Sequence, residues 1–279
     1  MANAGTRNPP TITPRKTRSM KTENKTLNIA GKKTQLTILG EGPPLLYLHS
    51  AGGETEPIAF HHKLAEKYTV YLPAHPGFAL SEGLDQIEDI HDLAWHYVDL
   101  LGELNLENVP VVSYSLGAWT AAEVKLMRPN LIGPMVMIAA AGLHVDGSPM
   151  EELFIDSFDK LRELLFFDPK GQEAVDYFPA DTNDPRILMW LRAREATARV
   201  GWNPYLHDPK LAGHLHRLNS PVQVIWGRHD KLIPLAHGEY YAKHLPNAKL
   251  TVLEECGHMV PYEKTEETAT IALDFLGSV

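Results

Sequence analysis

The chain has 279 residues, of which 44% are hydrophobic and 22% are charged, and its formal net charge is −9. This composition is typical of a globular protein with a sizeable core, and it excludes a fibrous or largely disordered chain. The first 22 residues hold five basic side chains and no acid, so the remainder carries 21 basic against 35 acidic residues. Because an acidic body repels phosphates, we expect no nucleic-acid partner.

Residues 1–22 are rich in Pro, Thr and Asn and poor in large apolar side chains. We therefore expect a disordered basic tail, with Met20 as an alternative natural start. No apolar run approaches the roughly 18 residues of a membrane span, so no membrane partner is expected. Cys256 is the single cysteine, which rules out an internal disulfide and fits a cytoplasmic protein. We interpret Cys256 as a small buried residue.

Strand and helix patterns alternate along the rest of the chain. The segments TLNIA and KTQLTIL predict an opening hairpin, with its first strand beginning near Lys25. Short apolar runs typical of strands buried on both faces follow at 44–49, 68–74, 109–115, 134–140, 221–227 and 249–254. Helical periodicity is clearest in EDIHDLAWHYVDLLGELN, and TEETATIALDFLGSV predicts a closing helix. This alternation predicts an α/β protein with a mostly parallel sheet and helices on both faces.

Residues 143–220 break the alternation. They contain no convincing strand pattern, but several helical pieces rich in large apolar side chains. An insertion of this length is too long for a loop. We therefore expect a helical cap, or lid, at 143–220, carried by a core formed from 23–142 and 221–279.

Two serines lie two positions apart between a predicted strand and a predicted helix, in the stretch VPVVSYSLGAWTAAE. In a strand–turn–helix elbow, the residues two before and two after the nucleophile must be small, because the two backbones converge there. With Ser115 at the apex these positions hold Ser113 and Gly117, which are both small. With Ser113 at the apex, Val111 would clash. Ser115 is therefore the candidate nucleophile.

A serine hydroxyl attacks poorly unless a histidine takes its proton and a carboxylate orients that histidine. Asp230 follows the end of one predicted strand, and His258 lies in the loop after the next. The chain order Ser115, Asp230, His258 recurs in one large class of serine hydrolases. Each residue alone could instead be a turn aspartate or a surface histidine. Asp146, just after the strand that follows the elbow, is the rival acid.

Five stretches carry a resemblance to a known family: HSAGG (49–53), PAHPGFALSEG (73–83), SYSLGAW (113–119), GRHDKLIP (227–234) and CGHMVPYE (256–263). From about residue 25 to its end the chain resembles the α/β-hydrolase superfamily. It looks most like the lidded serine esterases and the meta-cleavage-product C–C hydrolases. The resemblance implies the α/β-hydrolase fold with an inserted helical lid, and a triad of the three residues named above.

The resemblance also implies an oxyanion hole made by the backbone N–H groups of Ala51 and Leu116. Ser50 stands where the family usually has glycine. We interpret His49 and His75 as structural, hydrogen-bonding histidines rather than catalytic ones.

The helical lid should supply the substrate pocket. The residues expected to line it are Ser50, Tyr114, Trp190, Arg192 and Met259. Arg192, Arg194 and Arg199 could hold a substrate carboxylate, as a cap arginine does in the C–C hydrolases, or could simply face solvent. Tyr114 stands where those C–C hydrolases often have asparagine, which favours an ester substrate.

The sequence therefore predicts a serine hydrolase that cleaves a small-molecule carboxylic ester or related acyl compound through an acyl-enzyme. One alternative is C–C bond hydrolysis of meta-cleavage products by the same triad. Another, from a different class, is a ligand-binding receptor with little turnover. This chemistry needs no cofactor and no metal, and we expect a cytoplasmic monomer or homodimer.

Overall fold

A computed structural model describes residues 21–155, 157–181 and 183–279. Most of the tail predicted at 1–22, including Met20, lies outside the described residues. The first strand, β1 (Thr22–Ile29), begins three residues before the predicted start at Lys25, and Thr22 pairs with Leu39. The sequence did not predict the first three residues of β1 because β1 is an edge strand with mostly exposed side chains. These residues lack the apolar pattern that marks a buried strand.

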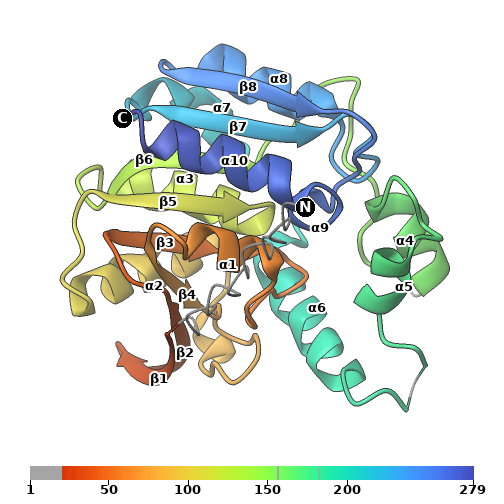
Figure 1. The fold of residues 1–279 in the computed structure, drawn as a ribbon, viewed down its shortest axis with the longest axis horizontal. Coiled ribbons are helices and arrows are strands. Elements are labelled where there is room, and N and C mark those ends of the chain that lie inside the picture. The colour runs from red at the N-terminus through yellow and green to blue at the C-terminus, as the bar shows by residue number, and fades with distance from the viewer. Residues whose placement is uncertain (1–20, 156, 182) are drawn as a thin grey trace, which may run out of the picture.

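Eight strands of the described chain form one sheet at the centre of the molecule, in the order β1-β2-β4-β3-β5-β6-β7-β8 (Figure 1). The hairpin of β1 and β2 (Lys32–Leu39) is antiparallel, and so is the pairing of β2 with β4 (Thr69–Pro73). All other neighbours are parallel. The remaining strands are β3 (Pro44–Leu48), β5 (Val109–Tyr114), β6 (Ile132–Ile138), β7 (Val222–Gly227) and β8 (Ala248–Leu253). The predicted mostly parallel sheet is confirmed.

Helices cover both faces of this sheet, which explains why its central strands are continuous apolar runs. Helices α1 (Ala59–Leu64) and α10 (Thr265–Leu276) pack together in front of the sheet in Figure 1. Helices α2 (Ile90–Glu103) and α3 (Leu116–Met127) pack together on the other face. The other helical elements of the core are η1 (Leu84–Gln86), α8 (Leu235–His244) and α9 (Val260–Glu263).

Residues 143–220, here called the helical segment, connect β6 to its neighbour β7. Their described part forms α4 (Phe158–Leu165), α5 (Gln172–Tyr177), α6 (Ile187–Gly201), α7 (Leu211–His214) and η2 (Leu215–Arg217). In Figure 1, α4, α5 and α6 lie beyond the carboxyl ends of the parallel strands, where ligand sites collect in open α/β sheets. The expected helical insertion therefore lies over the edge of the sheet at which the candidate residues meet.

The start of the helical segment pairs with residues that follow α6. An isolated parallel bridge joins Gly142 to His207. The Gly142 N–H donates to the Leu206 carbonyl at 3.0 Å, and the Asp208 N–H donates to the Gly142 carbonyl at 3.1 Å. The part of the helical segment that holds α4, α5 and α6 thus begins and ends at one place, and α7 and η2 follow it.

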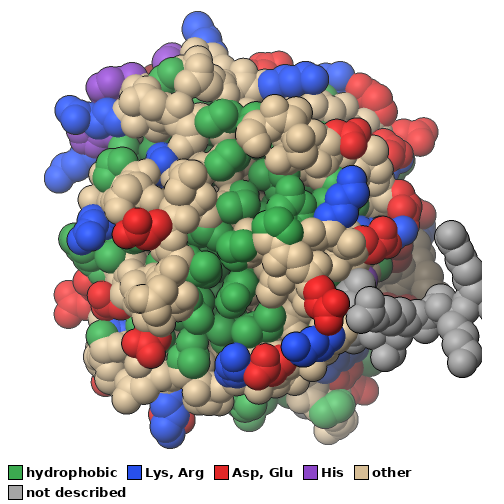
Figure 2. Space-filling view, turned by 60° about the vertical axis from the view of Figure 1, so that its left-hand side comes forward, with side chains coloured by type: hydrophobic (Ala, Val, Ile, Leu, Met, Phe, Trp, Pro, Cys, Tyr) green, Lys and Arg blue, Asp and Glu red, His purple; other side chains and the backbone are tan. Residues whose placement is uncertain are grey.

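On the face drawn in Figure 2, hydrophobic side chains run down the middle, and acidic and basic side chains are interspersed around them. Neither sign of charge is segregated on this face. None of the helices in the described residues is long and apolar enough to cross a membrane.

Candidate active site

Ser115 sits at the apex of the turn between β5 and α3, with the rare backbone angles φ 51° and ψ −111°. Such a conformation is strained for a residue other than glycine, and a nucleophile elbow requires it. A Cβ added to Gly117 would lie 2.1 Å from the Leu48 carbonyl oxygen. Only glycine therefore lets α3 approach β3 this closely, as the small-residue rule for the elbow predicts.

The neighbouring serine, Ser113, makes its hydrogen bond within the sheet. The Ser113 hydroxyl donates to the Val136 carbonyl of β6 at 3.0 Å, and the side chain is buried inside the sheet. The structure therefore brings Ser115, and not Ser113, to the histidine.

His258 contacts both of its expected partners. Its Nε2 lies 3.1 Å from Ser115 Oγ, and its Nδ1 lies 2.7 Å from Asp230 Oδ2. Because a carboxylate only accepts, Nδ1 carries the proton and Nε2 is left as the acceptor for the serine hydroxyl. The other Asp230 oxygen, Oδ1, accepts from the N–H groups of Leu232 at 3.0 Å and Ile233 at 2.8 Å. The carboxylate is thus fixed on both sides.

The loop that carries His258 is held from two directions. The His258 N–H donates to the Leu165 carbonyl of α4 at 2.8 Å, and the Tyr114 hydroxyl donates to the His258 carbonyl at 3.0 Å. A Cβ on Gly257 would lie 2.6 Å from the Leu165 carbonyl oxygen. Cys256 is buried beside this loop, and burial raises the pKa of its thiol. The helical segment therefore helps to position the histidine.

The loop carrying Ala51 is organised by a buried carboxylate, that of Glu54. Glu54 accepts hydrogen bonds from the N–H and the hydroxyl of Ser50, both at 2.8 Å. The Tyr177 hydroxyl, from α5, also hydrogen-bonds to Glu54. Burial raises the pKa of Glu54, and the hydrogen bonds from Ser50 oppose the rise. Ala51 borders the cavity described below, and Leu116 begins α3, where the first N–H groups have no partner within the helix.

Glu54 and Tyr177 were not among the predicted residues. The signal was present in the sequence HSAGGE: a serine at the usual glycine position, followed four residues later by an acid. Tyr177, however, lies more than a hundred positions away on another element, and no local pattern links it to Glu54.

His49 and His75 form a buried pair behind this loop. His49 Nδ1 donates to the Ser50 carbonyl at 2.7 Å, and its Nε2 accepts from the His75 N–H at 3.0 Å. His75 Nε2 donates to the His49 carbonyl, and its Nδ1 accepts from Tyr97. Burial lowers the pKa of His49 to about 4 and that of His75 well below its usual value. Both rings are therefore neutral and serve as hydrogen-bonding supports.

A cavity lies between the sheet edge and the helical segment. Its lining is mostly apolar and comprises Ser50, Ala51, Gly52, Tyr114, Ser115, Leu153, Phe154, Leu161, Leu165, Tyr177, Phe178, Trp190, Arg194, Thr197, Leu232, His258 and Met259. Four of the five residues predicted for the pocket are in this set: Ser50, Tyr114, Trp190 and Met259.

The fifth, Arg192, is not among the lining residues, whereas Arg194 is. Residues four apart on a helix share a face, so Arg194 lies beside Trp190, whereas Arg192 points to the other side of α6. The Arg194 guanidinium lies 4.5 Å from the centre of the Trp190 ring and donates to the Leu153 carbonyl at 3.2 Å. Arg199 does not line the cavity either.

The rival acid, Asp146, lies on the surface. Its side chain is fully exposed and pairs with His144 at 3.3 Å. The structure therefore brings Asp230, rather than Asp146, to His258. The described residues also contain a group with the spacing of metal ligands, His91, Glu123 and Asp208, and none of these three lines the cavity.

Comparison with known proteins agrees with this architecture. The model of the alpha/beta hydrolase family matches residues 42–271. The 2-hydroxy-6-oxononadienedioate/2-hydroxy-6-oxononatrienedioate hydrolase 2 of Pseudomonas putida is 24% identical over 260 residues, covering 88% of each chain. A monoacylglycerol lipase of Homo sapiens is 24% identical, covering 86% of this chain and 77% of the lipase.

Among solved structures, the 2-hydroxy-6-oxo-6-phenylhexa-2,4-dienoate hydrolase of Rhodococcus sp. strain RHA1 matches with a TM-score of 0.76 and 21% identity. The match covers 93% of this chain and all of that one. At this identity the likeness establishes the fold and leaves the substrate open.

Proposed function

This chain belongs to the alpha/beta hydrolase family, and we propose that it is a serine hydrolase that cleaves a carboxylic ester or related acyl compound through an acyl-enzyme. The observation that carries this proposal is the unbroken series of contacts from Asp230 through His258 to Ser115 at the edge of an apolar cavity. That arrangement activates a serine hydroxyl as a nucleophile.

In the first half-reaction, Ser115 Oγ attacks the acyl carbon while His258 Nε2 takes the hydroxyl proton. Asp230 stabilises the imidazolium that results. The N–H groups of Ala51 and Leu116 bind the oxyanion of the tetrahedral intermediate. The bond to the alcohol then breaks, and His258 returns its proton to the leaving oxygen.

In the second half-reaction, a water molecule takes the place of the alcohol. His258 removes a proton from the water, and the resulting hydroxide attacks the acyl carbon of the Ser115 ester. Collapse of this intermediate releases the carboxylic acid and restores the serine hydroxyl. Every step uses side chains and N–H groups of this chain, and no cofactor or metal enters.

The helical segment acts in this proposal as the lid that selects the substrate. Aromatic and aliphatic side chains from it, including Phe154 and Trp190, line the cavity together with Ser115. Burial of an acyl chain against them favours apolar esters, at roughly 25 cal/mol per Å² of apolar surface.

A second candidate reaction is C–C hydrolysis of a meta-cleavage product by the same triad. The observation in its favour is Arg194, a permanently charged side chain in a mostly apolar cavity lining. A guanidinium there suits a substrate carboxylate, such as the acid end of a dienoate. Several relatives of this chain are named as hydrolases of such compounds.

A third possibility is a receptor that binds a small molecule in the same cavity and turns it over slowly. A fluorophosphonate probe distinguishes it from an enzyme, because the probe labels only an activated serine. The proposal expects labelling at Ser115, absent from Ser115→Ala and retained in Ser113→Gly. A labelled peptide from elsewhere would relocate the site.

The deciding experiment compares initial rates on p-nitrophenyl esters of increasing acyl length with rates on a dienoate meta-cleavage product. Ester turnover that rises with acyl length supports the esterase. Faster turnover of the dienoate favours the C–C hydrolase, and Arg194→Gln should then weaken the dienoate reaction while sparing the esters. Absence of turnover on every substrate would favour the receptor.

A further inference from the structure

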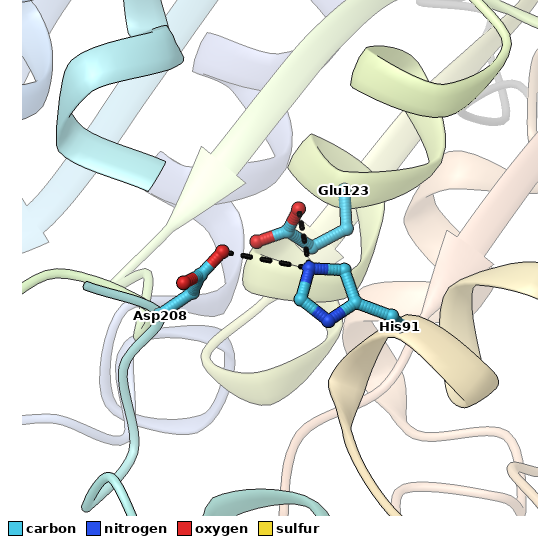
Figure 3. A group of neighbouring side chains, drawn as sticks. All are labelled: His91, Glu123 and Asp208. Carbon is cyan, nitrogen blue, oxygen red and sulfur yellow. Dashed lines mark ion pairs between the residues drawn. The ribbon is translucent and has the colours of Figure 1, made fainter. Parts of the chain in front are cut away.

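Three side chains of types that bind metals come together from distant parts of the chain, and none of them lines the cavity. His91 lies in the first turn of α2, Glu123 lies on α3, and Asp208 lies just before α7 (Figure 3). One ligand atom from each of the three lies within 4.8 Å of the other two. The two carboxylates and the imidazole point toward one another in Figure 3.

The distances from the imidazole to the two carboxylates leave room for an ion between them. His91 Nε2 lies 3.5 Å from Asp208 Oδ2 and 3.9 Å from Glu123 Oε2. Both distances exceed the roughly 3.2 Å limit of a good N–H···O hydrogen bond. A tetrahedral ion with nitrogen and oxygen ligands at roughly 2.1 Å separates those ligands by about 3.4 Å.

Among the described residues, the carboxylates of Glu123 and Asp208 have no lysine or arginine partner. Glu123 is only 3% exposed. Its Oε1 accepts from the Trp119 indole at 3.0 Å, while its Oε2, aimed at His91, accepts no hydrogen bond from any residue that the structure describes. Asp208 is 10% exposed, and within the described ranges neither carboxylate pairs with a lysine or arginine. Burial of paired negative charges is costly without a cation between them.

Access to the cluster suits a metal with an open coordination position. The His91 side chain is 42% exposed, so an ion can enter and water can supply the fourth ligand. Imidazole with two carboxylates is a donor set that suits Zn²⁺, with Mn²⁺ a weaker competitor for the same ligands.

We propose that His91, Glu123 and Asp208 bind one zinc ion per chain. The ion would join α2 and α3 to the returning end of the helical segment, next to the bridge between Gly142 and His207. Its role is structural, since none of its ligands lines the cavity. Metal binding to the folded chain adds stability that the unfolded chain lacks.

The test is calorimetric titration of ZnCl₂ into chelator-treated, full-length protein, paired with thermal melts with and without EDTA. We expect one ion per chain and a melting temperature that EDTA lowers. Glu123→Gln and Asp208→Asn keep the size of each side chain and remove a ligand charge, so each should weaken zinc binding at least about tenfold. Their melting temperatures should no longer respond to EDTA.

Two control variants separate this cluster from other histidines. His258→Ala removes the histidine of the proposed triad, and His144→Ala removes an exposed histidine near His207. Both should bind zinc as the parent protein does. Absence of zinc binding to the parent, or binding that survives Glu123→Gln and Asp208→Asn, would overturn the proposal and leave only an ion pair. Binding lost in His258→Ala would place the ion in the cavity instead.

Discussion

The two sides of the cavity are held by different kinds of contact. On the sheet side, Ser115, Asp230 and His258 are at most 6% exposed, and directional hydrogen bonds fix the carboxylate and the imidazole on both sides. On the side of the helical segment, Trp190 is in contact with Phe158 at a ring distance of 4.9 Å and with Arg194 at 4.5 Å, and Trp190 is only partly buried. Proton transfer needs atoms placed to within a fraction of an ångström. Apolar packing tolerates exchange of side chains of similar volume.

This difference in contacts indicates that the sheet side carries out the reaction and that the helical segment selects the substrate. Changes on the sheet side should reduce kcat for every substrate. Changes on the side of the helical segment should alter KM and the order of preference among substrates.

The largest expected effect is at the apex of the elbow. Ser115→Ala removes the nucleophile and should lower kcat by roughly 10⁴-fold or more. Ser113→Ala loses only the hydrogen bond to Val136 and should retain activity within about tenfold. Steady-state kinetics on a p-nitrophenyl ester measure both. An inactive Ser113→Ala beside an active Ser115→Ala would reverse the assignment.

The next effect is at the orienting acid. Asp230→Asn keeps the shape of the side chain but lets an amide face His258, so the wrong tautomer is favoured and kcat should fall by roughly 10²- to 10⁴-fold. The matched control is Asp146→Asn on the surface, which should leave kcat unchanged. A crippled Asp146→Asn with a mild Asp230→Asn would make Asp146 the acid.

A smaller effect is expected where the two sides meet, at Glu54. In Glu54→Gln only one of the two terminal atoms can accept, so one Ser50 donor faces an NH₂ group and the Ala51 loop loses a hydrogen bond. We expect kcat to fall about tenfold with little change in KM, which corresponds to about 1.4 kcal/mol.

Tyr177→Phe is the companion variant, because it removes the contact from α5 and leaves both Ser50 hydrogen bonds intact. Its loss of kcat should be smaller than that of Glu54→Gln. An equal fall in both variants would mean that docking of the helical segment, rather than the loop itself, controls the step. Unchanged kcat in Glu54→Gln would remove Glu54 from the positioning of the oxyanion loop.

The smallest expected effect on the chemistry is on the far side of the cavity. Trp190→Leu removes ring surface without adding a polar group, so KM for long-chain esters should rise about tenfold while kcat for acetate esters stays nearly constant. A kinetic series over acyl length measures the split. A uniform fall in kcat across the series would show that Trp190 supports the triad, and the two sides would no longer be distinct.

Much of the fold and of the sheet side of the site could be predicted from the sequence. Continuous apolar runs identify buried strands, and the elbow around Ser115 has a steric rule that excludes its neighbour. Asp230 and His258 follow strand ends, and parallel strands bring their carboxyl ends to one edge of the sheet. These are local patterns with a fixed consequence in space.

The rest depends on contacts between distant segments. Which face of α6 is turned toward the cavity determines whether Arg192 or Arg194 lines it, and composition alone does not predict that face. Glu54 meets Tyr177, and Glu123 meets His91 and Asp208, only after the chain has folded. Such pairs leave no periodicity or spacing in the sequence.

The bridge between Gly142 and His207 also has a consequence for how the substrate range of such a chain can change in evolution. Because Gly142 and His207 are paired, the part of the helical segment that holds α4, α5 and α6 begins and ends at neighbouring points of the structure. Its length and content can change without shifting the register of β6 and β7. Transplanting the corresponding segment of a relative between Gly142 and His207 is therefore a direct way to give this catalytic platform a new substrate range.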